Sequence, residues 1–210
     1  MKKYFPHALL AIYIIEFIVL GINPYSRAVW WVENIPIVLL VGVMTFLYYR
    51  KVRFSNLTYA LIFILPFWHT IGGHYTFERV PFQWFTDFFG FERNMFDRIG
   101  HFAVGFYALP IMEYVWSRGI IKTKLVTILY GIFAIAFVAA CYEWIEWIYA
   151  VKEGGEAGAA FLGSQGDIWD AQKDMLCDVL GACVAGVVWA REKVYTRWYD
   201  NILRFRRNNR

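Results

Sequence analysis

The chain has 210 residues, of which 59% are hydrophobic and 20% aromatic, and its mean hydropathy is +0.40. This composition is too apolar for an ordinary soluble domain and indicates a polytopic membrane protein. The net charge of +4 is mild, and three cysteines without a Cys-x-x-Cys pair argue against a disulfide framework.

Six apolar segments follow along the chain, each near the ~20 residues that a helix needs to cross a bilayer. They cover about residues 8–22, 35–49, 57–72, 98–116, 125–149 and 174–190. The first resembles a signal peptide, but no clear cleavage site follows, so we interpret it as an uncleaved helix. The prediction is an all-α, six-transmembrane-helix bundle that forms a single domain over residues 1–210.

The basic residues predict how this bundle is oriented. If alternate connections face the cytoplasm, 15 of the 21 Lys and Arg residues lie inside, seven of them in the tail 191–210. Cytoplasmic loops carry such an excess, so we expect both termini in the cytoplasm. The basic tail could also be a nucleic-acid patch, but membrane anchoring explains it more simply and no nucleic-acid partner is expected.

Two outward-facing connections have distinct compositions. The stretch 78–96 is crowded with Phe and Trp, which suits a segment lying in the membrane interface. The loop 152–166 is rich in Gly and Ala, and the sequence leaves open whether it is a lid or a shallow re-entrant segment.

The start of the last apolar segment carries an acidic face. Asp170, Asp174 and Asp178 recur every four residues, so a helix stacks them along one side. Helix capping would explain Asp167 and Asp170, but it explains Asp174 poorly and Asp178 not at all. Carboxylates in a membrane helix face protein or water, so these acids need a partner such as a cation.

Other polar residues are expected at the same outer end of the bundle. Small residues such as Gly105 share a face with His101 and would let helices approach closely there. With the aspartates, the candidates are His69, Asp97, His101, Glu143 and Glu146. Each has a structural alternative, since Asn94-x-x-Asp97 resembles a capping arrangement and His69 could be a hydrogen-bonded interfacial histidine.

Carboxylates with one or two imidazoles form a ligand set for a divalent ion such as Zn²⁺, Mn²⁺ or Fe²⁺. We therefore expect a divalent metal as cofactor, with a ligand set of His69, Asp97, His101, Asp170 and Asp174, and catalytic roles for Glu143, Glu146 and Asp178. A metal-free network of shared protons is the alternative. No phosphate loop, His-Glu-x-x-His pair or Gly-x-Ser-x-Gly elbow occurs.

Together, these motifs resemble the YjdF-like inner-membrane proteins of bacteria over nearly the whole chain. The motifs are His69-x-x-Gly-Gly-His74, Asp97–Arg98-x-Gly–His101–Phe102, Glu143-x-x-Glu146 and Asp167-x-x-Asp170-x-Gln–Lys–Asp174-x-x-x-Asp178. More distantly, the pattern is similar to VanZ-like proteins, which are associated with teicoplanin resistance and usually carry a Lys where this chain has Arg98. The resemblance implies a multi-pass protein of the bacterial cytoplasmic membrane and supplies no reaction.

The leading functional hypothesis is a metal-dependent hydrolase or transferase that acts on an envelope lipid or lipid-linked precursor. The alternative is a non-enzymatic VanZ-like factor or small transporter that uses the acids as cation or proton sites. A transporter needs access from both sides, whereas the inner halves of the helices offer few polar groups beyond Glu113. We therefore expect a one-sided site and membrane lipids as partners.

Overall fold

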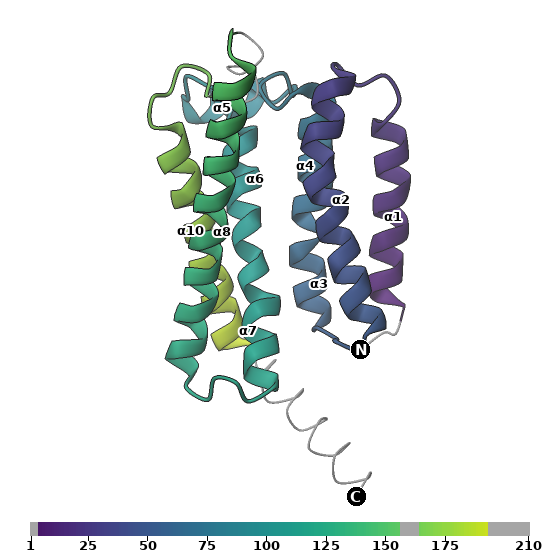
Figure 1. The fold of residues 1–210 in the computed structure, drawn as a ribbon, viewed down its shortest axis with the longest axis vertical. Coiled ribbons are helices and arrows are strands. Elements are labelled where there is room, and N and C mark those ends of the chain that lie inside the picture. The colour runs from purple at the N-terminus through teal and green to yellow at the C-terminus, as the bar shows by residue number, and fades with distance from the viewer. Residues whose placement is uncertain (1–3, 156–163, 193–210) are drawn as a thin grey trace, which may run out of the picture.

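The computed structural model describes residues 4–155 and 164–192, and within them every regular element is helical. The elements are α1 (Phe5–Leu20), α2 (Arg27–Tyr49), α3 (Asn56–Ile62), α4 (Ile64–Tyr75), α5 (Gln83–Phe89), α6 (Phe96–Val104), the 3₁₀ turn η1 (Gly105–Tyr107), α7 (Ala108–Ser117), α8 (Lys124–Glu153) and α10 (Asp170–Arg191). Apart from the short α5, they run along one common axis, and the chain reverses direction at each end of the bundle (Figure 1). The all-α prediction is confirmed for the described residues.

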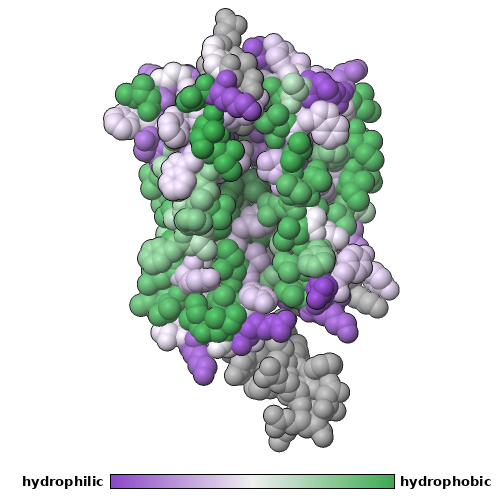
Figure 2. Space-filling model, viewed as in Figure 1, coloured by the Kyte–Doolittle hydropathy of each residue, from purple (hydrophilic) through white to green (hydrophobic). Residues whose placement is uncertain are grey.

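The outer surfaces of the longest helices are apolar. Two described helices, α2 and α8, are long and apolar enough to cross a membrane, and α1 is a shorter apolar helix. Only 28% and 22% of the apolar windows of α2 and α8 are buried, so most of their apolar side chains face outward. Figure 2 shows this apolar band around the middle of the molecule, with polar residues towards both ends. Such a surface suits contact with lipid.

The helix ends lie within four residues of the predicted segments except in the second, which begins at Arg27 rather than residue 35. Ser26 starts this helix, because its Oγ accepts a hydrogen bond from the backbone N–H of Val29 at 3.4 Å. The first turns carry Glu33 and Asn34, which interrupt the apolar run in the sequence although both are buried in the fold. The apolar segment at 35–49 is therefore shorter than the helix α2 that contains it.

Two predicted segments are interrupted at proline residues. The third divides into α3 and α4 at Phe63, three residues before Pro66. The fourth contains η1 between α6 and α7, just before Pro110. Proline lacks an N–H and clashes with the carbonyl four residues earlier. The helical series of backbone hydrogen bonds is therefore interrupted at Ile62 and Phe106. Each pair of pieces still follows one line along the bundle (Figure 1).

The helices pack in two halves, which meet mainly through α4 and α6. In one half α10 packs against α6, η1, α7 and α8, and its core contains Met112, Ile135 and Trp189. In the other half α4 packs against α1, α2 and α3 around Tyr13, Ile37 and Tyr59. At the front of the view in Figure 1, α8 and α2 form the facing edges of the two halves.

The aromatic stretch 78–96 lies across one end of the bundle and contains α5 (Figure 1). Its Trp84, Phe88 and Phe89 are exposed, while Phe82 and Phe96 are buried against Trp68. Exposed aromatic rings at this end suit the membrane interface that the sequence predicted. Most of the Gly- and Ala-rich loop and nearly all of the basic tail, residues 156–163 and 193–210, lie outside the described residues.

The backbones of α6, η1 and α10 touch at two glycines. A Cβ placed on Gly181 would lie 2.0 Å from the carbonyl oxygen of Phe102, and one on Gly105 would lie 2.3 Å from the backbone nitrogen of Ala182. No side chain fits at either position without separating the helices. The predicted close approach of small residues is thus confirmed here, and it sets the distance between His101 and Asp178.

We expect Gly181→Ala to separate α10 from α6 and to lower the free energy of unfolding in detergent by at least about 1–3 kcal/mol. Gly42→Ala is the matched control, because a Cβ on Gly42 meets nothing within 4 Å and Ala favours a helix. Thermal unfolding of the two purified variants checks this. Equal stability would show that the two helices do not pack as described.

Candidate functional site

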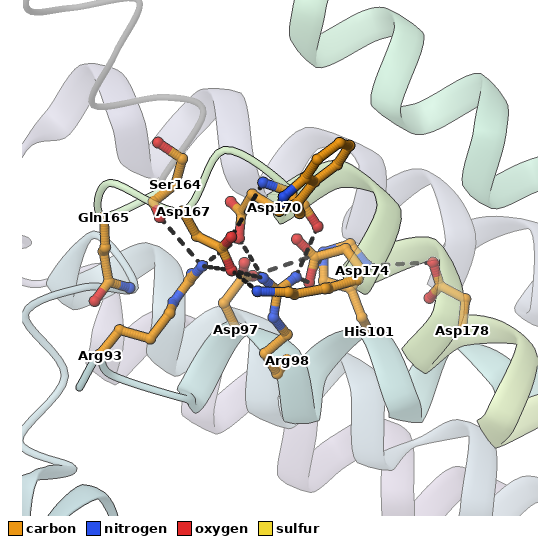
Figure 3. Close-up of polar contacts among 12 residues, drawn as sticks. Arg93, Asp97, Arg98, His101, Ser164, Gln165, Asp167, Asp170, Asp174 and Asp178 are labelled. Carbon is orange, nitrogen blue, oxygen red and sulfur yellow. Dashed lines mark hydrogen bonds and ion pairs between the residues drawn. The ribbon is translucent and has the colours of Figure 1, made fainter. Parts of the chain in front are cut away.

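The site is organised around Arg98, which lies in the first turns of α6 and is 5% exposed. Its Nη1 donates to the backbone carbonyl of Asp170 at 2.9 Å, and its Nη2 donates to Oδ1 of Asp170 at 2.5 Å and to Oδ2 of Asp167 at 3.2 Å. The same guanidinium forms an ion pair with Asp174 (Figure 3). A buried guanidinium has five donors in a fixed plane, so one Arg98 can bind several carboxylates at once.

Asp167, just before α10, is held by a second set of contacts. Lys173 Nζ donates to its Oδ2 at 2.6 Å, and its Oδ1 accepts the Trp169 backbone N–H at 3.0 Å in a turn. The Lys173 hydrogen bond, helped by the Trp169 N–H, lowers the pKa of Asp167. This contact therefore stabilises the fold above the ordinary carboxyl pKa, and its contribution is lost as the pH falls through the lowered value.

Hydrogen bonds and an ion pair join the segment before α10 to the segment before α6. The Asn94 backbone N–H donates to Gln165 Oε1 at 3.0 Å, and Gln165 Nε2 returns a hydrogen bond to the Asn94 carbonyl at 3.2 Å. Arg93 donates to the Ser164 carbonyl at 3.2 Å and forms an ion pair with Asp170. These contacts bring the starts of α6 and α10 to the same end of the bundle (Figure 3).

His101 lies one turn further along α6 and faces three aspartates. Its Nδ1 is 3.3 Å from Asp178 Oδ2, and its Nε2 is 3.7 Å from Asp174 Oδ1 and 3.8 Å from Asp97 Oδ1. Ligand atoms of Asp97, His101 and Asp174 all lie within 4.8 Å of one another. The expected proximity of these three side chains is therefore confirmed, while their role as metal ligands stays a prediction.

The cluster carries more negative than positive charge. Five carboxylates, from Asp97 and the four aspartates between 167 and 178, share three cationic side chains from Arg93, Arg98 and Lys173. The negative charges exceed the positive ones by two when His101 is neutral and by one when it is protonated. Uncompensated charge at this depth is costly, so a divalent cation or added protons would stabilise the cluster.

Asp178 is the deepest acid of the series, with 1% of its surface exposed. Its Oδ2 contacts His101, but its Oδ1 has no hydrogen-bond partner among the described residues. A buried oxygen without a partner costs about 1–3 kcal/mol, and more when it is charged. Asp178 also lines a cavity, so a ligand in that cavity could satisfy this oxygen.

This cavity has a volume of about 240 Å³ and lies between α2, α4, α6 and α8. One part of its wall is apolar, and the other part is formed by Glu33, His69, Thr76, Asp97, His101, Tyr142, Glu146 and Asp178. Figure 2 shows a furrow between the two halves, with paler, more polar residues at its base. The donor cluster therefore opens into a space that a small ligand can enter.

The structure separates the remaining predicted site residues into groups. Asp170 is bound by Arg93 and Arg98 and lies outside the group of three converging donors. His69 is 3.3 Å from Glu33 Oε2, on the opposite wall of the cavity. Glu146 lines the cavity, whereas Glu143 does not, although it is buried with an Oε1 that lacks a hydrogen-bond partner.

Sequence reasoning did not include Glu33 or Tyr142 in the site and gave Arg93 and Arg98 no place in it. Glu33 was missed because the second apolar segment was started after it. The available signal was the presence of two arginines on either side of the start of α6 together with the aspartates at the start of α10, since a buried acid needs a cation. Glu113, at the opposite end, accepts hydrogen bonds from Ser55 N and Thr58 Oγ1 and so completes the start of α3.

Comparison with known proteins agrees with this fold. A family model described as a predicted membrane protein (DUF2238) matches residues 5–193. The chain belongs to this family. It is also similar to the inner membrane protein YjdF of Escherichia coli strain K12, with 33% identity over 174 residues, which are 81% of this chain and 82% of the relative. No solved structure shows a significant match.

The family and the apolar helices place the protein in the bacterial inner membrane as a multi-pass protein. The resemblance to YjdF-like proteins is thus confirmed. The more distant similarity to VanZ-like proteins stays a prediction.

Substitution of Arg98 by Gln should destabilise the protein by about 3–5 kcal/mol, because it leaves the buried acids Asp170 and Asp174 without their main cation. Arg79→Gln is the control, since Arg79 is half exposed and its pair with Glu78 contributes about 0–1 kcal/mol. Denaturation in detergent measures both. An Arg98→Gln protein as stable as wild type would contradict the central role of this ion-pair network.

Proposed function

We propose that this protein crosses the membrane six times with both termini in the cytoplasm. Six helical passes support this count when α3 with α4, and α6 with α7, are each taken as one pass. The passes alternate in direction, so α1 begins at the end of the bundle where α10 ends (Figure 1). With 15 of the 21 basic residues on that side, the aspartate cluster faces outward.

The cluster is proposed to hold one divalent metal ion through Asp97, His101 and Asp174. The observation that carries this proposal is the convergence of their ligand atoms within 4.8 Å beside a cavity. Carboxylate and imidazole donors suit Zn²⁺, Mn²⁺ or Fe²⁺. Arg98 would share the Asp174 carboxylate with the ion, and the excess of negative charge in the cluster favours a cation.

The proposed activity is hydrolysis or group transfer on an envelope lipid or lipid-linked precursor. A bound divalent ion would polarise a carbonyl or phosphoryl oxygen and lower the pKa of a bound water. Glu146 faces the same cavity and is placed to accept a proton from a water or hydroxyl group there. Asp178 holds the Nδ1 side of His101 and so fixes the ring that presents Nε2 to the ion.

A second candidate is a lipid- or cation-binding protein without catalytic activity. The ion pairs of Arg93 and Arg98 favour it, because they neutralise Asp170 and part of the cluster without a metal. The convergence of the Asp97, His101 and Asp174 ligand atoms beside the cavity favours the metal site. Metal content separates the two proposals.

We expect about one divalent ion per chain in detergent-purified wild-type protein, and at least about tenfold weaker binding in Asp97→Asn and His101→Gln. Loss of a residue that only hydrogen-bonds to a metal ligand lowers metal affinity about 10–100-fold. Loss of a direct ligand should therefore lower it by at least as much. Elemental analysis and a metal titration measure this.

Glu113→Gln is the control for the metal experiment. It removes a buried carboxylate at the other end of the bundle, and its amide keeps an oxygen that accepts from the Ser55 N–H and gains an NH₂ that can donate to Thr58 Oγ1. Wild-type protein that is folded but metal-free after incubation with Zn²⁺, Mn²⁺ or Fe²⁺ would contradict the metal site and leave the binding protein as the better proposal.

The topology is tested with reporter fusions. Green fluorescent protein after Arg210 should fluoresce, and alkaline phosphatase should be inactive there but active after Arg79, in the connection at the opposite end. Active phosphatase after Arg210 would contradict both the cytoplasmic termini and the outward-facing cluster.

A further inference from the structure

The cavity is open at the side of the bundle, between α2 and α8. Pro36 on α2 and Val138 on α8 line it and are themselves exposed on the lateral surface. Figure 2 looks at the molecule across its long axis, and the furrow between the two halves faces the viewer. In the membrane this opening faces lipid, so a molecule can enter it sideways with its chain still in the bilayer.

The wall of the cavity divides into an apolar and an acidic part. The apolar side chains include Ile37, Leu40, Leu65 and Val104, with Val138 at the mouth. The acidic part contains four carboxylates, from Glu33, Asp97, Glu146 and Asp178, and two imidazoles. The lining residues include neither Lys nor Arg. The cavity therefore suits an amphipathic ligand whose polar end is positively charged.

A metal ion in the proposed site would not remove this preference. It would compensate Asp97 and its neighbours in the cluster, and Glu33 already pairs with His69 on the opposite wall. Glu146 would remain as a carboxylate facing the cavity without an ion pair among the described residues. Tyr142 and Phe77 add aromatic rings to the same wall, and such rings attract cationic groups.

We propose that the cavity binds a lipid whose headgroup carries an ammonium group, with Glu146 facing the ammonium and one chain leaving between α2 and α8. This proposal names the class of lipid on which the proposed function would act. Binding of that lipid does not depend on the proposed function; only its chemical conversion rests on it. The volume of about 240 Å³ is below the roughly 300–1,000 Å³ of pockets that bury a drug-sized ligand. It therefore holds the headgroup and the first part of one chain.

The test uses the full chain in phosphatidylglycerol nanodiscs, whose lipid carries no ammonium group, and three photoreactive probes with the same diazirine-bearing sixteen-carbon chain: hexadecylamine, hexadecanol and hexadecyl phosphate. After irradiation, mass spectrometry measures the labelling of the peptides that contain Leu40 and Val138. We expect the amine to label these peptides at least about tenfold more than the alcohol, because a hydrogen bond to a charged group contributes more than a neutral one and tenfold corresponds to only about 1.4 kcal/mol. The phosphate should label them least.

Two pairs of variants locate the binding. Val138→Trp places a bulky ring at the mouth and should abolish labelling by all probes, whereas Val43→Trp adds the same ring to an exposed position of α2 outside the cavity and should not. Glu146→Gln should reduce amine labelling about tenfold and leave alcohol labelling unchanged, while Glu113→Gln should change neither. Because Val138 and Val43 are both about half exposed, neither replacement disturbs the core.

Three outcomes would overturn the proposal. Equal amine labelling in Val138→Trp and wild type would show that the chain does not enter between α2 and α8. Equal labelling by amine and alcohol in wild type would remove the ammonium preference. A preference for hexadecyl phosphate that disappears with chelator would support the metal site while contradicting an ammonium headgroup.

Amine labelling is repeated in Asp97→Asn and in the presence of chelator. Retained labelling in protein that has lost its metal supports the ammonium site independently of the ion. Retained labelling in wild-type protein that never binds metal would contradict the proposed function alone, so the two proposals fail separately.

Discussion

The burial of one guanidinium among three aspartates is the interaction on which one end of the bundle depends. Arg98 joins the start of α6 to the start of α10, two segments that are far apart in the sequence. In a low-dielectric environment neither the arginine nor its acids could remain charged alone. The helices must therefore meet at this end, and the Asn94–Gln165 pair adds a neutral contact in the same place.

The Gly105–Gly181 contact has the complementary role in the middle of the bundle. It lets the backbones of η1 and α10 touch, so His101 reaches Asp174 and Asp178 without a long side chain. Charge neutralisation at the end and close packing in the middle together hold α10 against α6. The two halves of the protein do not approach equally closely at α2 and α8, and the lateral cavity lies there.

This arrangement suggests why the polar groups are unevenly distributed along the bundle. At one end acids and bases converge beside a cavity. At the other end, both carboxylate oxygens of Glu113 accept hydrogen bonds from the start of α3. The middle of the bundle between them is filled by apolar side chains such as Met112 and Trp189. A polar cavity near one end of the bundle supports the proposed role in binding or modifying a lipid more than passage through the bundle.

The sequence by itself determined the helical class, the membrane setting and the membership of Asp97, His101 and Asp174 in one cluster. Apolar runs and the four-residue spacing of the acids depend only on local periodicity and on the cost of burying charge, so they can be read from the chain. Only the tertiary structure showed that Glu33 on α2 shares a cavity with these residues, and that Arg93 and Arg98 bind Asp170. Such pairings depend on which helices pack together and how far apart they stay, and no local pattern encodes that distance.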